Sequence, residues 1–493
     1  IVTRHRRGLQ SGLTPEEAAV TAIDTSGRAV LFAGGTVCIA LLGIFVLGMT
    51  FLNGLAVACA LTVVFTVAAA VTLLPALLGV FGSRVLSRRQ RRRLAGDATA
   101  PGSTGLWARW SATVERRPAV FAAAAAAVMV ILAIPVLSVR LGSTDQGNDP
   151  ASTTTRQAYD LLAKGFGPGY NGPLQLVAQV SGASQHSAFE RVERAVAATP
   201  GVVGSTRPQF IPSRQPGGPG IALADVYPKG SPQDASTSDL LHTVRNTVVP
   251  AAERGTGVHV LVGGQTAIFD DFATVLSRKL PLFLTIVIGL SFLLLMTVFR
   301  SVVIPAIAAA MNLLSAAAAF GVVTAVFQDG FGASLLGIDK TGPIEAFVPV
   351  FMFAILFGLS MDYEVFLVTR IYEEWHRRRN NREAVVHGLA ATGRTITAAA
   401  AIMVLVFGAF ILGGERVIDL FGVGLASAVL IDALVVRSVL VPALMLMIGD
   451  ANWWLPSWLD RFLPHLRVEG ATARGTVEPA PVHDQVVPEP VAS

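Results

Sequence analysis

Charged side chains are scarce in this chain of 493 residues. They make up only 14% of it, whereas hydrophobic residues make up 52% and the mean hydropathy is +0.59. An average soluble globular protein carries about 25% charged residues. The composition therefore excludes an ordinary soluble protein and favours a chain that lies largely in a lipid bilayer.

Cysteine and lysine are also rare. The two cysteines, Cys38 and Cys59, stand inside apolar runs, as small core residues do, and their placement does not suggest a disulfide or a metal site. We expect no metal and no other cofactor. Only four of the 38 basic residues are lysine, and this preference for arginine hints at a GC-rich, actinobacterial type of genome.

Motifs for several function classes are missing. The sequence has no Gly-x-x-x-x-Gly-Lys-Ser/Thr loop, so an ATP-driven motor in this chain is not expected. The basic clusters that raise the pI to 9.5 lie beside apolar segments, as the positive-inside rule predicts, so nucleic-acid binding is not expected either. Energy for any transport would come from an ion gradient or a partner.

Long apolar runs are what the chain does contain. A membrane helix needs about 18 or more apolar residues. Eight such spans are predicted at roughly 29–49, 54–81, 119–138, 281–299, 302–327, 346–369, 395–413 and 418–448.

Arginine-rich flanks indicate the orientation of these spans. If the helices alternate in direction, Arg4–Arg7, Arg88–Arg93 and Arg377–Arg382 all fall on one side of the membrane. Positive flanks mark the cytoplasmic side. The sequence therefore predicts a multi-pass protein of the plasma membrane with both termini in the cytoplasm and one long outer segment, residues 139–278.

The outer segment has the pattern of a small α+β domain. Strand-like and helix-like stretches alternate in a β-α-β-β-α-β-like order, with strands near 174–180, 221–226 and 258–262 and helices near 187–198 and 239–248. The Gly/Pro-rich run 215–220 is expected to form a hairpin or a mobile loop. The segment has no acid pair, no metal-ligand spacing and no nucleophile with a base, so we expect a substrate-guiding or docking module and no enzyme.

The sequence also contains an internal repeat. Val2-Thr3-Arg4 matches Val368-Thr369-Arg370 at an offset of 366, and Gly48 matches Gly414 at the same offset; after a slip of one residue, Pro75 matches Pro442. Parallel repeats of this kind build transporters whose binding sites lie between the halves.

Projected backwards, the offset places the counterparts of Asp362 and Tyr363 before Ile1. The chain also begins with Ile and without a signal peptide. We expect a fragment of a longer protein whose remaining part would hold a further outer domain and four spans, giving twelve in all.

Asp362 and Tyr363 stand inside a segment that is otherwise apolar enough to span a bilayer. An aspartate at the centre of a membrane helix costs at least ~2.5 kcal/mol on insertion scales, so a pathway, a relay or a counter-ion is the default interpretation. The neighbouring tyrosine offers a hydroxyl that can pass or anchor a hydrogen bond. The alternative is that Asp362 only joins helices through a buried hydrogen bond.

Three further charged residues accompany this pair. Glu364 lies about 200° around the helix from Asp362, so it is expected to face another helix or water. Asp432 and Arg437 are five residues apart, about 140° on an α-helix, which argues against a same-face pair. Arg437 is expected to snorkel to the cytoplasmic interface. Asp432 is either an auxiliary relay group or structural glue between helices, and Glu364 is an auxiliary candidate.

Two motifs resemble those of a known family. The run from Phe357 to Leu367 (FGLSMDYEVFL), with Thr369-Arg370 and Glu373-Glu374-Trp375 after it, and the run from Ile431 to Arg437 (IDALVVR), followed by Val441-Pro442-Ala443, resemble the MmpL branch of the resistance-nodulation-division transporters. The resemblance extends from Ile1 to about Gly449.

This resemblance implies a proton-motive-force-driven exporter of lipids or other hydrophobic molecules to the cell envelope, of a kind common in actinobacteria. It also implies that an Asp-Tyr pair in each half forms the proton relay. Only the pair of the second half, Asp362 and Tyr363, is present here, which puts transport by this chain alone in doubt.

The expected fold is an α-helical integral membrane protein with a repeat bundle of eight transmembrane helices and an α+β extracytoplasmic porter-like domain. The predicted segments are the end of a first membrane repeat with two spans (1–81), a basic cytoplasmic linker with an interfacial helix (82–118), one span (119–138), the outer domain (139–278), a second repeat of five spans (279–449) and a largely disordered cytoplasmic tail (450–493).

Two hypotheses of function remain open. The first is the proton-coupled exporter, whose partners are protons, membrane lipids and a hydrophobic cargo. The second is a receptor or assembly scaffold of the same superfamily that binds a lipid or a protein and transports nothing. Homo-oligomers and envelope accessory proteins are compatible with both.

Overall fold

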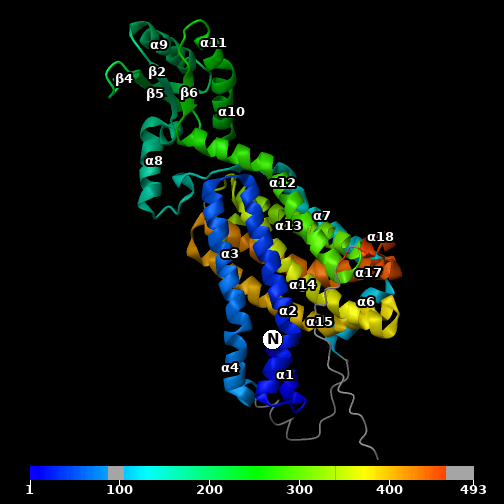
Figure 1. Cartoon of the computed structure of the whole chain (residues 1–493). Coiled ribbons are helices and arrows are strands. Elements are labelled where there is room, and N and C mark those ends of the chain that lie inside the picture. Colours follow the sequence, from blue (N-terminus) through cyan, green and yellow to red (C-terminus); the bar gives the residue numbers. More distant parts are fainter. Residues whose placement is uncertain (87–104, 339, 462, 464–493) are drawn as a thin grey trace, which may run out of the picture.

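The computed structural model describes residues 1–86, 105–338, 340–461 and 463. A small α+β domain stands at one end of a long helical bundle (Figure 1). The basic run Arg88–Arg93 and the tail after residue 463 lie outside the described residues. About half of the predicted linker and the predicted disorder of the tail therefore lie outside them as well.

Eight helical segments within the described residues are long and apolar enough to cross a membrane. They agree in number and position with the eight predicted spans, so the α-helical membrane class is confirmed. The helices that form them are α2 (Pro15–Leu42), α3 (Thr50–Val71), α4 (Leu73–Phe81), α7 (Pro118–Ala133), α12 (Gln265–Phe299), α13 (Val303–Phe327), α14 (Val348–Arg378), α15 (Asn381–Gly408), α16 (Arg416–Ile431) and α17 (Val441–Ile448). Shorter helices are α1 (Val2–Gln10), α6 (Leu106–Arg116) and α18 (Ser457–Asp460).

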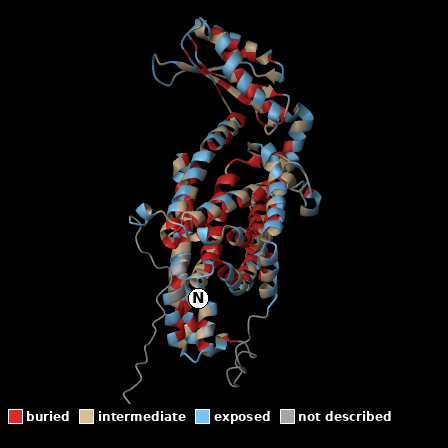
Figure 2. Cartoon of the chain, turned by 90° about the vertical axis from the view of Figure 1, so that its right-hand side faces the viewer, coloured by how far each residue is buried: buried red, intermediate tan, exposed pale blue. Residues whose placement is uncertain are grey.

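Helix α14 lies at the centre of the bundle. In its most apolar stretch 78% of the residues are buried, against 6% in the α3–α4 segment. It packs against α2, α13, α15 and α16, and Figure 2 shows the buried residues concentrated along the inside of the bundle. A polar side chain on α14 is therefore surrounded by protein on most sides.

The sequence repeat is reproduced in the bounds of the helices. α2 and α15 each continue into a short 3₁₀ turn that ends at a glycine with a left-handed backbone, Gly48 (φ 66°) in one case and Gly414 (φ 70°) in the other. The first residues of the two helices, Pro15 and Asn381, are also separated by the offset of 366. Glycine adopts this conformation without the strain that other residues incur, which explains why both positions are glycine.

The α+β domain is built on an antiparallel sheet of five strands in the order β3-β5-β2-β6, with β4 paired to β5 alone. Alternate residues of β2, among them Leu174 and Leu176, are buried against Phe189 and Val192 of α9. The strands are β2 (Leu174–Val180), β3 (Val202–Ser205), β4 (Gln209–Ile211), β5 (Gly220–Pro228) and β6 (Val260–Gly263), and the helices are α8 (Thr154–Phe166), α9 (Ala183–Ala197), α10 (Ala235–Thr243) and α11 (Val249–Glu253).

The three strands and two helices predicted for this domain are present; β2 has the predicted bounds, and the other elements have shifted ends. The helices α8 and α11 were not predicted. The Gly/Pro-rich run 215–220 joins β4 to β5, which pair antiparallel, so it forms the loop of a hairpin. β3 and β4 were not predicted, because strands of four and three residues are too short to show an alternating pattern.

Two connections join the domain to the bundle. Helix α12 runs from the domain into the bundle as one helix (Figure 1). A short parallel pair is formed by β1 (Leu141–Gly142), at the entry to the domain, and β7 (Ile344–Glu345), just before α14. The second connection ties the domain to the helix that carries Asp362.

Candidate functional site

The polar run of α14 lies near the middle of the helix. Asp362 is 14 residues beyond Val348, the first residue of α14, which corresponds to ~21 Å along the helix axis. Neighbouring side chains of this run point to different helices, because successive residues of an α-helix are about 100° apart. The run therefore divides into two groups.

A fully buried ion cluster is the first group. The Arg437 guanidinium lies 3.1 Å from Glu364 Oε2 through Nη1 and 3.2 Å from Asp432 Oδ2 through Nε. All three side chains are at most 2% exposed. Arg437 Nη2 also donates to the Ser360 carbonyl oxygen at 2.8 Å. The cluster joins α14 to the last membrane segment.

The pairing of Asp432 with Arg437 contradicts the prediction from α-helical geometry. The segment Asp432–Leu440 between α16 and α17 is a π-helix, in which hydrogen bonds join residues five apart. Residues separated by five positions therefore lie one above the other. The expectation that Arg437 snorkels to the interface is also wrong, since its side chain is 0% exposed.

The one-residue slip of the sequence repeat accounts for this π-helix. The offset is 366 up to Gly414 and 367 at Pro442, so the second half contains one additional residue between these positions. The π-helical segment lies within that interval. A helix can accept an extra residue by widening one turn, and the residues after that turn then keep their positions. The additional residue in the second half thereby brings Asp432 and Arg437 onto the same side of their helix, as the ion cluster requires.

Two polar residues that the sequence analysis did not select complete the cluster. The Ser360 hydroxyl lies 2.6 Å from Asn312 Oδ1 and 3.2 Å from Asp432 Oδ1. Asn312 belongs to α13 and is 3% exposed. A signal for it was available, because it is the only side-chain amide in the 25 residues of α13.

The cluster holds more acid than base. Two carboxyl groups, Glu364 and Asp432, face one guanidinium in a site closed to water. An unpaired charge in such a place is very costly and a buried group is neutralised by protonation instead. The arrangement therefore favours a cluster that holds one proton on a carboxyl group.

Asp362 and Tyr363 form the second group, and they do not contact the cluster through any described hydrogen bond. Asp362 Oδ1 is buried and has no hydrogen-bond partner among the described residues. The Tyr363 hydroxyl lies 2.9 Å from the sulfur of Met403 on α15. The described hydrogen bonds thus do not join the two residues of the predicted relay to one another.

The structure thus separates the four candidates chosen from the sequence. Glu364 and Asp432 share Arg437, whereas the Tyr363 hydroxyl contacts Met403 and Asp362 Oδ1 has no described hydrogen-bond partner. Among the described residues, no group of three or more His, Cys, Asp or Glu side chains is placed to hold a metal ion.

Comparison with known proteins places the chain in a family. A family model described as "MMPL family" matches residues 1–121 and 157–464. The chain is 36% identical over 487 residues to membrane protein YdfJ of Bacillus subtilis, covering 98% of this chain and 65% of that protein. It is 32% identical over 497 residues to the trehalose monomycolate exporter MmpL3 of Mycobacterium tuberculosis, covering 94% of this chain and 51% of that protein.

A second relative from Mycobacterium tuberculosis, named heme uptake protein MmpL11, is 36% identical over 471 residues, which cover 94% of this chain and 48% of that protein. The chain thus spans about half to two thirds of the length of these relatives. The names of the two mycobacterial relatives describe transport and not an enzyme activity. Because the family model covers most of its length, this chain, a multi-pass membrane protein, belongs to the MMPL family.

Proposed function

We propose that this chain is the second half of a proton-motive-force-driven exporter of lipids or other hydrophobic molecules, in which Asp362 and Tyr363 form half of the proton relay. The observation that carries the proposal is the state of Asp362. It is a carboxyl group in the middle of the central helix, and its buried Oδ1 has no partner among the described residues. Such a group is free to take up and release a proton as its surroundings change.

The buried ion cluster supports the same function as an auxiliary element. Its two carboxyl groups and one guanidinium connect α14 to the last membrane segment. Loss of the proton from this cluster would leave one uncompensated negative charge, which is expensive in a dry interior. Protonation thereby biases how α14 packs against its neighbours, which is what coupling to transport requires.

The other half of the relay would come from the rest of the protein. The relatives are considerably longer than this chain, and the helix bounds repeat at a fixed offset. By the repeat, the other half would contain a helix that matches α14, and the resemblance to the MmpL branch implies that this helix carries its own Asp-Tyr pair. We place both termini of the chain in the cytoplasm and the α+β domain outside, because the arginine-rich flanks then lie on the cytoplasmic side.

The cargo is proposed as a lipid or a similarly hydrophobic molecule. One relative is named for the export of a glycolipid and another for the uptake of heme. Both names describe large amphiphilic or hydrophobic molecules. One name describes export and the other describes uptake. The direction proposed for this chain, export, therefore rests on the proposed coupling to protons and is to be measured separately.

Proton uptake into proteoliposomes tests the proposal. The protein with its remaining half is reconstituted, a pH gradient is imposed, and wild type is compared with Asp362→Asn. The amide is neutral and similar in size, so folding and insertion are expected to be retained while proton uptake is lost. Asp329→Asn, at an exposed carboxylate just after α13, is the matched control and should behave as wild type. Equal uptake in wild type and Asp362→Asn favours the receptor or scaffold.

A further inference from the structure

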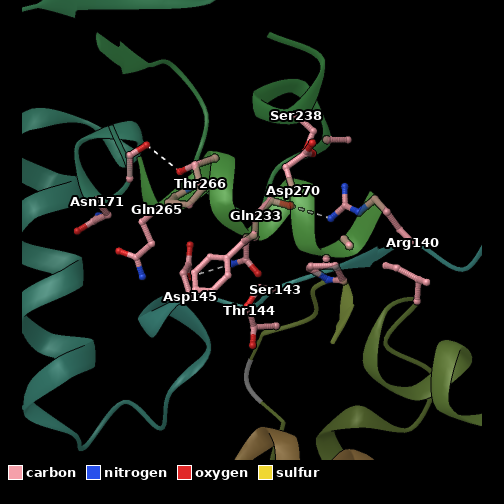
Figure 3. A pocket seen from close by; sticks show the side chains of 18 of the residues that line it. Arg140, Ser143, Thr144, Asp145, Asn171, Gln233, Ser238, Gln265, Thr266 and Asp270 are labelled. Carbon is pink, nitrogen blue, oxygen red and sulfur yellow. Dashed lines mark hydrogen bonds between the residues drawn. The ribbon is translucent and has the colours of Figure 1, made fainter. Parts of the chain in front are cut away.

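Two features of the molecule lie outside the candidate site. One is a cavity of about 250 Å³ where the α+β domain meets the bundle, lined among others by Gln233 and Asp270 (Figure 3). It contains none of the three residues of the ion cluster. The other is helix α6, which contacts the membrane segment that carries Asp432 and Arg437. Of the two, α6 is therefore the one that can act on the cluster.

A tryptophan of α6 donates a hydrogen bond to this segment. Trp110 Nε1 lies 3.0 Å from the carbonyl oxygen of Ser438. Ser438 follows Arg437 directly and belongs to the π-helix Asp432–Leu440. Carbonyl groups in the interior of a helix ordinarily accept from the backbone of the same helix. A side-chain donor from another helix therefore needs a reason.

The reason lies four residues further along the chain, at Pro442. In an α-helix the Ser438 carbonyl oxygen would accept the amide hydrogen of residue 442. Proline has no amide hydrogen, so the carbonyl group loses that donor. Leaving a buried carbonyl group without a donor is costly. The indole N–H group of Trp110 takes the place of the missing amide.

The first repeat contains the same proline without the same continuous helix. Pro75 matches Pro442 after the slip of one residue. Val71 therefore holds the position of Ser438. There the helix is interrupted, because α3 ends at Val71 and α4 begins at Leu73. In the second repeat the π-helix continues directly into α17. The unbroken backbone thus coincides with the tryptophan donor.

Helix α6 has a defined position against the bundle. The ring of Trp107 packs on the backbone of Gly393 in α15, where an added Cβ atom would lie 2.4 Å from the ring. The Trp110 ring meets Phe121 of α7 edge to face, with the ring centroids 5.9 Å apart. The donor of the hydrogen bond is therefore held in place by two neighbouring helices.

We propose that Trp110 is a positioning residue for the ion cluster. Its hydrogen bond holds the π-helix in the form that brings Arg437 to Glu364 and Asp432. The proposal goes beyond the proposed function and rests on it only for what the cluster does in transport. Since α6 lies at the end of the segment that joins the two repeats, a movement of this segment would reach the cluster through Trp110.

Trp110→Phe tests the hydrogen bond, since phenylalanine keeps an aromatic ring beside Phe121 and lacks the N–H group. Without the bond the π-helix should loosen, and the Arg437 guanidinium should move away from the two carboxyl groups. Both carboxyl groups should then be protonated, because neither has its cation in a dry interior. The variant should therefore show more protonated carboxyl than wild type.

Infrared spectroscopy of the reconstituted full protein at pH 7 measures this through the carbonyl band of protonated carboxyl groups. The band of the cluster is identified as the one that is lost in Glu364→Gln, where one acid faces one base. In Trp110→Phe this band should grow by up to about twofold, as a second carboxyl group takes up a proton. A loss of packing alone would not change the charge of the cluster.

Two further variants separate the hydrogen bond from packing. Trp107→Phe makes the same replacement three residues earlier on α6 and should leave the band unchanged. Pro442→Ala restores an amide hydrogen four residues after Ser438, which can donate to that carbonyl oxygen in place of the indole. In the Pro442→Ala background, Trp110→Phe should therefore no longer enlarge the band.

Two outcomes would overturn the proposal: an unchanged band in Trp110→Phe, or growth of the same size in the Pro442→Ala background, which would mean that Trp110 acts through packing. The measurement involves no transport, so its failure is distinct from that of the proposed function. Band growth together with proton uptake that survives in Asp362→Asn overturns the relay and leaves the role of Trp110 standing. Lost uptake in Asp362→Asn without band growth overturns the role of Trp110 alone.

Discussion

Arg437 and Glu364 lie 3.1 Å apart, on different membrane helices, with side chains that are 0% and 1% exposed. The pair is buried at the centre of the bundle. Asp432, which lies on the same membrane segment as Arg437, also contacts this guanidinium. The stability of this region therefore depends on the balance of charge among three side chains.

Arg437→Met should destabilise the protein strongly. It leaves two carboxyl groups in a dry interior without their cation, and breaking a buried pair in this way costs about 3–5 kcal/mol. The unfolding midpoint in detergent measures the loss. Arg382→Met, which removes an exposed pair with Glu115, is the matched control and should cost about 0–1 kcal/mol. Similar losses in both variants would contradict the cluster.

Glu364→Gln should be tolerated, in contrast to the loss of the arginine. If the cluster already holds one proton, a neutral amide resembles the protonated carboxyl group and leaves one acid facing one base. The same unfolding assay should show a much smaller loss than for Arg437→Met. A loss as large as that of Arg437→Met would mean that both carboxylates are charged.

Tyr363→Phe should leave folding intact and reduce proton uptake. The hydroxyl contacts only the Met403 sulfur among the described hydrogen bonds, so its removal costs little stability. A relay that uses the hydroxyl should slow down in proteoliposomes. Wild-type uptake in this variant would remove Tyr363 from the relay.

Glu345→Ala should loosen the connection between the α+β domain and α14. The Thr144 amide loses its charged acceptor, and hydrogen bonds to charged groups contribute about 1.5–3 kcal/mol. Hydrogen exchange of that amide should therefore speed up by roughly 10- to 100-fold. Glu415→Ala, at an exposed carboxylate just before α16, serves as control and should leave the exchange of Thr144 unchanged.

The pH dependence of stability should carry a contribution from Asp145. Burial raises the pKa of this carboxyl group in the folded domain, above the ordinary value of about 3.9 that it has when unfolded. The folded state thus binds the proton more tightly, and this contribution destabilises the domain as pH rises through the folded pKa.

Asp145→Asn should therefore gain stability relative to wild type above that pKa and lose the advantage as pH falls towards 4. The difference between the two unfolding midpoints, measured from pH 4 to pH 8, isolates this one group. A difference that does not change with pH would contradict the account.

The sequence predicted the parts of this fold that depend on hydrophobicity. All eight spans agree with the predictions from apolar runs and periodicity, as do β2, β5, β6, α9 and α10 of the α+β domain, whereas the 13-residue helix α8 was not predicted. The apolar pattern did not show that Asp432 and Arg437 share a face, because that depends on a π-helix, whose mark in the sequence is the one-residue slip of the repeat. The contact of Ser360 with Asn312 was equally hidden, since it depends on which faces of α13 and α14 meet.

The central claim is that Asp362 exchanges a proton within the membrane. Infrared difference spectroscopy of the reconstituted full protein, titrated across neutral pH, measures this directly through the carbonyl band of a protonated carboxyl group. We predict a titrating band in wild type that is absent in Asp362→Asn and retained in Asp329→Asn. A band of equal size in wild type and Asp362→Asn would show that another group carries the proton and would contradict the account.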